Sequence, residues 1–261
     1  MEKMKQKELG LPLEYGQLSE YFDLFSEQCN KDAKNNVIES ILKKYSVKTV
    51  LDLTCGTGSQ LFYLANHGYT VIGADFSQNL LAIAHKKALE EKLDIQCIHG
   101  DMRTLQVGTF DAVITIDNAV GHVSKDDFEK TMRNVHSNLK DGGLYVFDIF
   151  NAQAMTSKVV DALFMDRLGM QNGIHFHQVQ HSAFDGERNL LTSYDRFTLY
   201  KEVENQTTLT GEFTLQIYSA QELRDMLVRS GFEVLGQYGM DGLEFIENQT
   251  LNILTVAQRQ K

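Results

Sequence analysis

Apolar segments alternate with helical segments between residues 49 and 149, and this alternation limits the possible folds more than any other feature of the chain. The apolar segments, each bounded by turn residues, are Thr49–Thr54, Thr70–Asp75, Ile95–His99, Phe110–Asp117 and Leu144–Ile149. Continuous apolar runs of this kind are typical of strands buried on both faces of a parallel sheet. Because helices join them, we predict right-handed crossovers and an α/β fold with a doubly wound sheet.

Helix signals lie before and between these segments. Residues 31–45 carry apolar side chains at helical spacing, and Ser77 and Ser124 are suited to cap the helices that follow them. Gly142 and Gly143 are expected to end the helix that begins after Ser124.

A different pattern runs from Ile174 to Tyr218, where apolar and polar residues alternate with a period of two. This alternation predicts antiparallel strands, with turns at Asp185-Gly186 and near Asn205-Gln206. An antiparallel β insertion is therefore expected within the α/β domain.

The doubly wound pattern resumes after the insertion. Ser219 and Glu222 have the spacing of a capping box at the start of a helix. Two strands, at residues 233–238 and 251–257, then complete the sheet. The turn near Asp241-Gly242 between them is too short for a crossover helix, so the last strand is expected to run antiparallel.

Composition excludes several classes of protein. The 261 residues include 25 basic and 35 acidic side chains, a formal net charge of −10, so binding of nucleic acid through a basic surface is disfavoured. No apolar run approaches a membrane span, and the charged start MEKMKQKELG differs from a signal peptide. Three scattered cysteines do not make a disulfide framework. We expect a cytoplasmic monomer or homodimer that acts on a small molecule, without a nucleic-acid or membrane partner.

The strongest functional signal is VLDLTCGTG at residues 50–58, a strand that runs into a glycine loop and a helix. Gly56 and Gly58 let the backbone approach a ligand closely, with helix N–H groups facing it. Nineteen residues after Gly56 the second strand ends in Asp75, whose carboxylate can accept both hydroxyls of a ribose. The third and fourth strands also end in polar residues, at the carboxyl edge where open α/β sheets bind ligands.

A nicotinamide dinucleotide is the obvious competing ligand. The dinucleotide fingerprint needs a third glycine for close helix packing beside the pyrophosphate, and Leu61 stands at that position. The residues therefore favour a ligand with a ribose and an adenine but no diphosphate, and a dinucleotide oxidoreductase is a distant alternative.

Four ordered segments resemble the motifs of class I S-adenosylmethionine-dependent methyltransferases: VLDLTCGTG, VIGADFSQNLLAIA, HGDM and LKDGGLYVFD. The resemblance spans roughly residues 48–150, and Thr54 stands where the family has glycine or alanine. It implies a seven-stranded Rossmann-like sheet, S-adenosylmethionine as the methyl donor and S-adenosylhomocysteine as the product.

The resemblance also implies roles for single residues. It places the two loop glycines around the aminocarboxypropyl chain and Asp75 on the ribose. It places Asp101 and Met102 at the adenine, and Asp117 or Asn118 beside the sulfonium. Asp52 is expected to bind loop N–H groups or a water near the methionine amine. The full set of expected cofactor-binding residues is Tyr21, Asp52, Thr54, Cys55, Gly56, Thr57, Gly58, Asp75, Phe76, Asp101, Met102, Arg103, Asp117 and Asn118.

Within this family, the segment from Asp117 to Val123 and the insertion resemble small-molecule N-methyltransferases that act on glycine-type amines and amino sugars. Tyr21-Phe22-Asp23-Leu24 resembles the aromatic segment that covers the cofactor in such enzymes. The expected division is a helical lid segment (1–45), a cofactor-binding core (46–151), an insertion that forms the acceptor pocket (152–218), and the helix and strands that close the core (219–261).

Methyl transfer from a sulfonium is an in-line displacement, for which a protein supplies orientation, a dry site and proton management. His122, after the fourth strand, is the candidate catalytic base, with an ordinary pKa of about 6.5. The alternative is a structural histidine bonded to a backbone carbonyl.

Three further histidines, His175, His177 and His181, are predicted on one face of a strand. No carboxylate of matching spacing accompanies them, so we expect no metal site. The function that the sequence favours is methyl transfer to the amine nitrogen of a small, neutral or cationic acceptor. Transfer to oxygen or carbon, and a non-catalytic sensor that binds the cofactor, are the alternatives.

Overall fold

The computed structural model describes residues 9–25, 28–201 and 206–261, and it contains a seven-stranded sheet and a four-stranded sheet. The large sheet has the order β10-β11-β5-β4-β1-β2-β3. Its strands are β1 (Thr49–Asp52), β2 (Thr70–Asp75), β3 (Gln96–His99), β4 (Phe110–Thr115), β5 (Leu139–Phe150), β10 (Phe232–Tyr238) and β11 (Asn252–Arg259). Strands β1 to β5 pair in parallel, and β11 runs antiparallel to both of its neighbours. The predicted doubly wound sheet with a reversed last strand is confirmed.

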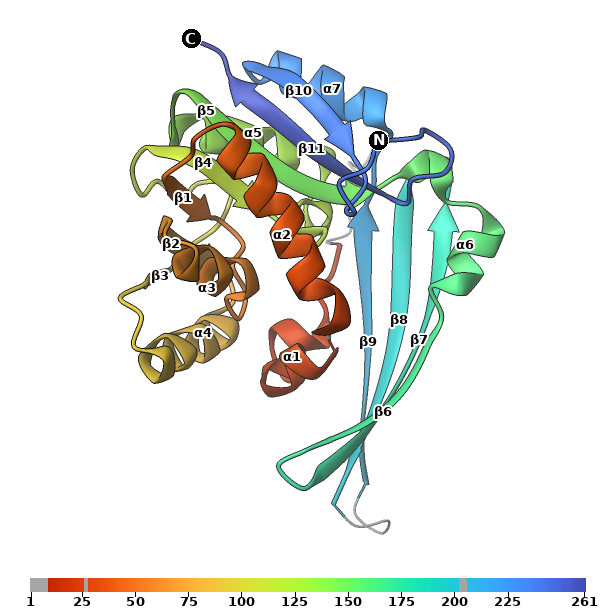
Figure 1. Ribbon diagram of the computed structural model, residues 1–261. Helices are drawn as coiled ribbons and strands as arrows, with labels where there is room; N and C mark the ends of the chain where they lie inside the picture. The colour runs from red at the N-terminus through yellow and green to blue at the C-terminus, as the bar shows by residue number, and fades with distance from the viewer. Residues whose placement is uncertain (1–8, 26–27, 202–205) are drawn as a thin grey trace, which may run out of the picture.

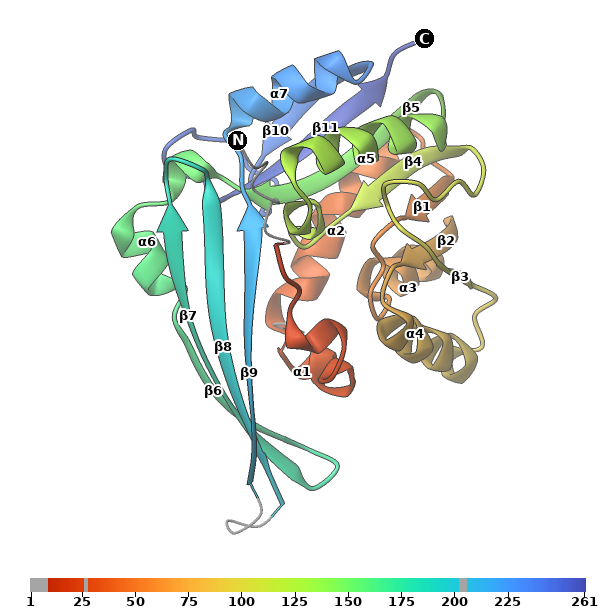
Figure 2. The ribbon, with the colours of Figure 1, turned by 180° about the vertical axis from the view of Figure 1, so that it is seen from behind.

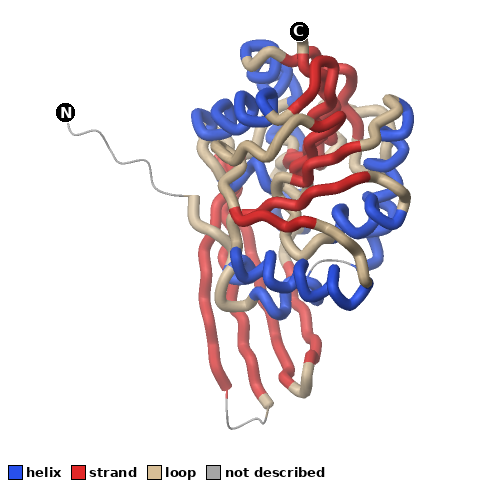
Figure 3. The backbone as a smooth tube through the Cα atoms, turned by 90° about the vertical axis from the view of Figure 1, so that its left-hand side faces the viewer, coloured by secondary structure: helices blue, strands red, loops and turns tan. Residues whose placement is uncertain are grey.

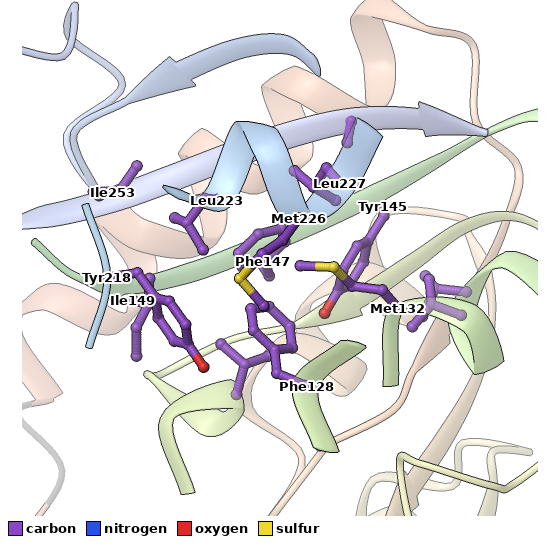
Figure 4. Packing of buried hydrophobic residues seen from close by; sticks show 14 of the residues in the cluster. Phe128, Met132, Tyr145, Phe147, Ile149, Tyr218, Leu223, Met226, Leu227 and Ile253 are labelled. Carbon is purple, nitrogen blue, oxygen red and sulfur yellow. The ribbon is translucent and has the colours of Figure 1, made fainter. Parts of the chain in front are cut away.

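Helices cover both faces of this sheet (Figure 3). They are α2 (Gln28–Lys44), α3 (Ser59–Asn66), α4 (Gln78–Glu91), α5 (Lys125–Ser137) and α7 (Ala220–Arg229). Strand β5 contributes to both layers. Tyr145 and Phe147 belong to the buried cluster that contains side chains of α5 and α7, and Val146 belongs to the cluster that contains side chains of α2, α3 and α4. Figure 4 shows the first layer, where Phe128 and Met226 meet these aromatic rings. Apolar runs without alternation are therefore explained by burial on both faces.

Serine side chains start three of the helices. Ser77, Ser124 and Ser219 each accept a hydrogen bond from a backbone N–H of the first helical turn, as the sequence predicted. The predicted end of α5 at Gly142 and Gly143 is wrong. The helix ends at Ser137, and both glycines lie inside β5.

The physical reason for this early end is Asn138, the residue that follows α5. Its side-chain amide donates to the carbonyl oxygens of Asn134 and Leu105, both at 2.9 Å. The bond to Asn134 satisfies a carbonyl group at the helix end, and the bond to Leu105 ties this end to the loop before β4, so no glycine is needed there.

The insertion is an antiparallel sheet of order β6-β7-β8-β9, and it projects away from the large sheet (Figure 1). Its strands are β6 (Met165–Gln171), β7 (Ile174–Asp185), β8 (Leu190–Tyr200) and β9 (Gln206–Gln216). The short helix α6 (Ser157–Ala162) precedes it. The turn predicted at Asp185-Gly186 separates β7 from β8. Asn205 of the other predicted turn lies outside the described residues.

Strand β6 was not predicted, although the sequence holds its signal. Asn172 and Gly173 join β6 to β7, and both have positive φ, at 52° and 76°. An Asn-Gly pair is the usual two-residue hairpin turn, so this dipeptide would have revealed the extra strand.

The N-terminal segment, residues 9–25, lies between the two sheets. It contains η1 (Leu13–Tyr15), η2 (Ser19–Tyr21) and α1 (Phe22–Phe25). Leu18 and Tyr21 pack with Phe176 and Phe197 on the inner face of the insertion. Figures 1 and 2 both show α1 between β9 and α4. Among the described helices, none is long and apolar enough to span a membrane.

Candidate functional site

A cavity of about 1980 Å³ opens at the carboxyl edge of the large sheet. Its walls come from the loop after β1, the ends of β2, β4 and β5, the N-terminal segment, the insertion and the connection between β10 and β11. Pockets for drug-sized ligands usually measure about 300–1,000 Å³. The cavity therefore has room for two ligands side by side.

The loop after β1 and the end of β2 form one hydrogen-bonded unit. The backbone N–H of Gly56 donates to Asp75 Oδ2 at 2.9 Å, and the N–H of Ser77 donates to Asp75 Oδ1 at 2.8 Å. Burial raises the pKa of Asp75, and these amides oppose the shift. The carboxylate is thus held by backbone groups and still lines the cavity.

The backbone favours glycine at both loop positions. Gly56 and Gly58 have φ values of 53° and 96°, a left-handed conformation that disfavours side chains. A Cβ atom on Gly58 would also lie 2.3 Å from the ring of Phe62. The loop therefore presents bare backbone to the cavity at Gly56.

Most of the residues predicted to form the site line this one cavity. They are Thr54, Cys55, Gly56, Thr57, Asp75, Phe76, Asp101, Met102, Arg103, Asp117, Asn118 and His122. Tyr21, Asp52 and Gly58 are not among its lining residues.

Tyr21 lies in the cluster with Phe176 and Phe197, with 3% of its surface exposed. Tyr15 and Phe22 line the cavity instead. The aromatic segment was therefore found in the sequence, but the structure places a different ring of it at the cavity.

Asp52 lies behind the loop. Its Oδ1 accepts a hydrogen bond of 3.3 Å from the N–H of Thr54, and its Oδ2 has no partner within the described residues. Burial raises its pKa well above the ordinary value. The bond from Thr54 agrees with the expected contact to a loop N–H group, and Oδ2 is a buried acceptor to which the alternative, a water near the methionine amine, would donate.

Asp101 is held by the residue two positions along the chain. The Arg103 guanidinium binds both of its carboxylate oxygens and also donates to Asp127 at 2.9 Å. The hydrogen bonds from Arg103 keep the pKa of Asp101 below its usual range, although burial opposes them. Asp101 is therefore an ionised acceptor at the cavity wall.

His122 closes the short helix η3 (Ala119–His122) and lines the cavity. Its Nε2 lies 3.3 Å from the hydroxyl oxygen of Tyr15, and its buried Nδ1 has no partner in the described part of the chain. Burial lowers its pKa to about 4, so the ordinary value expected from the sequence is corrected downward. The imidazole is neutral at physiological pH.

Sequence reasoning missed three polar residues beside the turn at Asp117 and Asn118. Lys34 on α2 forms an ion pair with Asp117. Asp148 at the end of β5 accepts the N–H of Asp117 at 2.6 Å, and Asn252 of β11 reaches Asn118 at 3.3 Å. These contacts join segments far apart in the chain, so no local signal marks them.

Comparison with known proteins agrees with this geometry. Residues 50–143 match the methyltransferase domain family. The matched segment contains the glycine loop, the ends of β2 to β4 and His122. Residues 50–143 of the chain are therefore a methyltransferase domain.

Two relatives extend this likeness beyond the matched segment. The methyltransferase is similar to a putative methyltransferase of Geobacillus, with 26% identity across 85% of this chain and 90% of the relative. It is also similar to a dTDP-3-amino-3,6-dideoxy-alpha-D-glucopyranose N,N-dimethyltransferase of Streptomyces fradiae, with 27% identity across 78% and 80% of the two chains.

A solved structure shares the fold. The crystal structure of an S-adenosylmethionine-dependent methyltransferase from Clostridium acetobutylicum superimposes with a TM-score of 0.77 at 19% identity. The likeness covers 95% of this chain and 99% of the other, so the insertion belongs to the shared architecture.

The half of the cavity that lies away from the glycine loop was only partly predicted from the sequence. Its walls include Met165 and Leu190 of the insertion and much of the connection from Gly239 to Asn252. In that connection Leu243 and Ile246 are 68% and 51% exposed. The sequence indicated only a turn there, so this wall was missed.

The three histidines of β7 lie on the insertion, and each has a neighbour. His175 stacks on Tyr200, and His181 stacks on Tyr194. His177 Nε2 lies 2.7 Å from Asp166 of β6, so the expectation that no carboxylate accompanies them is wrong. Strand β6 supplies it across the sheet. Among the described residues no set of three or more metal-ligating side chains is gathered.

Proposed function

We propose that this methyltransferase transfers a methyl group to an amine nitrogen of a small molecule. His122 carries the proposal, because its neutral imidazole lines the cavity beside the Tyr15 hydroxyl. A neutral imidazole can accept a hydrogen bond from an amine N–H and so orient the nitrogen lone pair. It also adds no positive charge beside a cationic donor. The amino-sugar N,N-dimethyltransferase named above supports nitrogen as the acceptor atom.

S-adenosylmethionine, when bound, supplies an already activated methyl group. We assign its nucleoside to the half of the cavity that contains the glycine loop. Asp75 would accept the ribose hydroxyls, with each oxygen already fixed by a backbone amide. Phe76, which is 44% exposed, offers a ring face for the adenine, and Asp101 with Met102 would border it.

The ion pair between Lys34 and Asp117 suits the methionine end of the donor. That end carries an α-carboxylate and an α-ammonium, and the pair offers one charge of each sign at the cavity wall. Lys34 would bind the carboxylate, while Asp117 would bind the ammonium or face the sulfonium.

The acceptor would occupy the other half, between His122 and the connection from Gly239 to Asn252. Leu243 and Ile246 offer apolar contact area to the body of the acceptor. The insertion and the N-terminal segment enclose this half and keep water from the reacting atoms.

Two measurements test the proposal. Transfer of labelled methyl from S-adenosylmethionine is followed with a panel of primary and secondary amines and with the matched alcohols. We expect labelled amines and no labelled alcohols, and the reverse result would overturn the choice of nitrogen. Calorimetry with S-adenosylhomocysteine should show binding at one site. Binding without transfer to any tested compound would favour a sensor.

A further inference from the structure

The turn after β4 has an unusual conformation. Asp117 and Asn118 both have positive φ, at 66° and 59°. Asp and Asn adopt this left-handed conformation more readily than other residues with a Cβ atom, but they do so as single residues, so two in succession point to support from the surrounding structure. The turn leads directly into η3, so it decides where Asp117, Asn118 and His122 lie in the cavity.

Support comes from Asp148 at the end of β5. Its Oδ1 accepts the N–H of Asp117 at 2.6 Å and that of Asn118 at 3.4 Å. Its Oδ2 lies 3.4 Å from the side-chain nitrogen of Asn252, which also donates to Asn118 Oδ1 at 3.3 Å. One carboxylate with 2% exposure therefore contacts both backbone amides of the turn and, through Asn252, one of its side chains.

The charges around this carboxylate come from two elements. Burial and the nearby carboxylate of Asp117 together raise the pKa of Asp148 to about 7, and the Lys34 ammonium of α2 and the two turn amides oppose this rise. Asn252, from β11, brings no charge. The carboxyl thus changes its protonation in the pH range where the enzyme would work.

We propose that Asp148 is a positioning residue for methyl transfer. By accepting the amides of Asp117 and Asn118, it holds the left-handed turn that aims these side chains and His122 at the reacting atoms. This role rests on the proposed function for its catalytic consequence. The hydrogen bonds that Asp148 accepts from the turn do not depend on that function.

Asp111 provides a matched control at the opposite edge of the same sheet. Its Oδ2 accepts the consecutive backbone amides of Lys48 and Thr49 at 3.0 and 2.9 Å. It is not among the residues that line the cavity. Each of the two aspartates thus accepts two consecutive backbone amides, Asp148 beside the cavity and Asp111 away from it.

The first measurement is amide hydrogen exchange in Asp148→Ala, Asp148→Asn, Asp111→Ala and the wild type. We expect Asp148→Ala to speed exchange at residues 117–122 by about tenfold or more, because the acceptor is gone. Asp148→Asn keeps an acceptor oxygen and should restore most of the protection. Asp111→Ala should speed exchange at residues 48–49 and leave 117–122 unchanged.

The second measurement is methyl transfer. Asp148→Ala should lower kcat by about tenfold or more, since a misplaced reacting group costs that much. Asp148→Asn should recover most of this loss, and Asp111→Ala should leave kcat and KM unchanged. The wild-type kcat should fall as the pH drops through about 7, since protonated Asp148 is a weaker acceptor, whereas Asp148→Asn should not show this inflection.

The proposal is overturned if Asp148→Ala lowers stability as Asp111→Ala does while exchange at 117–122 and kcat stay at wild-type values. If Asp148→Ala does not fold, the pH profile of Asp148→Asn decides, because an unchanged inflection would exclude Asp148 as its source. A wild type that transfers no methyl group would refute the proposed function alone, and hydrogen exchange would still test the hold on the turn.

Discussion

The two halves of the cavity are built in different ways. In the half that we propose for the cofactor, the backbone N–H groups of Gly56 and Ser77 donate to the carboxylate of Asp75, and the bond from Gly56 links the loop after β1 to the end of β2. In the half that we propose for the acceptor, the walls come from the insertion, the N-terminal segment and the connection before β11. Where backbone groups form a site, substitution of the few glycines that shape the backbone is poorly tolerated. Where side chains form a site, substitutions can change which ligand binds without loss of the fold.

The largest expected effect concerns the packing of the insertion against the N-terminal segment. Phe197 is fully buried in the cluster that joins the insertion to the N-terminal segment. Phe197→Ala should lower the free energy of unfolding by about 3–5 kcal/mol, measured by urea denaturation. Phe164→Ala is the control, because Phe164 is 54% exposed and should change stability by about 0.5 kcal/mol or less. Equal losses would contradict the assigned cluster.

His122 lies where the two halves meet. His122→Ala should lower turnover by about 100-fold, as expected for loss of a group that orients the acceptor amine. The affinity for S-adenosylhomocysteine, measured by calorimetry, should change by about threefold or less. Because the pKa of His122 is about 4, the imidazole stays neutral above about pH 5, and His122 should give no inflection near neutral pH. Unchanged turnover would contradict a catalytic role for His122 and favour a structural one.

Gly56→Ala tests the cofactor half. The new methyl group meets no close neighbour, since the nearest atoms lie 3.9 Å away, so the cost is the left-handed backbone alone. We expect a loss of about 1–2 kcal/mol in cofactor binding or stability. Acceptor KM at saturating cofactor should be unaffected, and a change confined to acceptor KM would break the division between the halves.

The smallest effect is expected at Leu243. Leu243→Ala removes part of the apolar wall and should raise acceptor KM by about threefold to tenfold with cofactor affinity unchanged. Leu168→Ala is the matched control, because Leu168 is 73% exposed on β6 and does not line the cavity. If both variants raise KM equally, Leu243 does not contact the acceptor.

The parts of the molecule that the sequence predicted share one property, which is that their signals are local. Apolar runs mark the strands of the large sheet, and the glycine loop with Asp75 marks one side of the site. The same locality explains the correct helix starts at Ser77, Ser124 and Ser219.

The parts that were missed depend on contacts between distant segments. Tyr15 reaches His122, and Lys34 reaches Asp117, only after the N-terminal elements fold against the sheet. Asp148 sits in a segment recognised as a strand, but its role follows from its distance to the turn. Strand β6 is the exception, since Asn172-Gly173 was a readable local signal.

The contacts of the N-terminal segment have a consequence for biosynthesis. The N–H of Thr214 donates to the carbonyl oxygen of Leu9 at 2.6 Å, and Ser77 Oγ donates to that of Tyr15 at 2.7 Å. A ribosome makes Thr214 about ten seconds or more after Leu9, at roughly 5–20 residues per second. The segment around Leu9 must therefore wait for the synthesis of β9 before it can reach its final place.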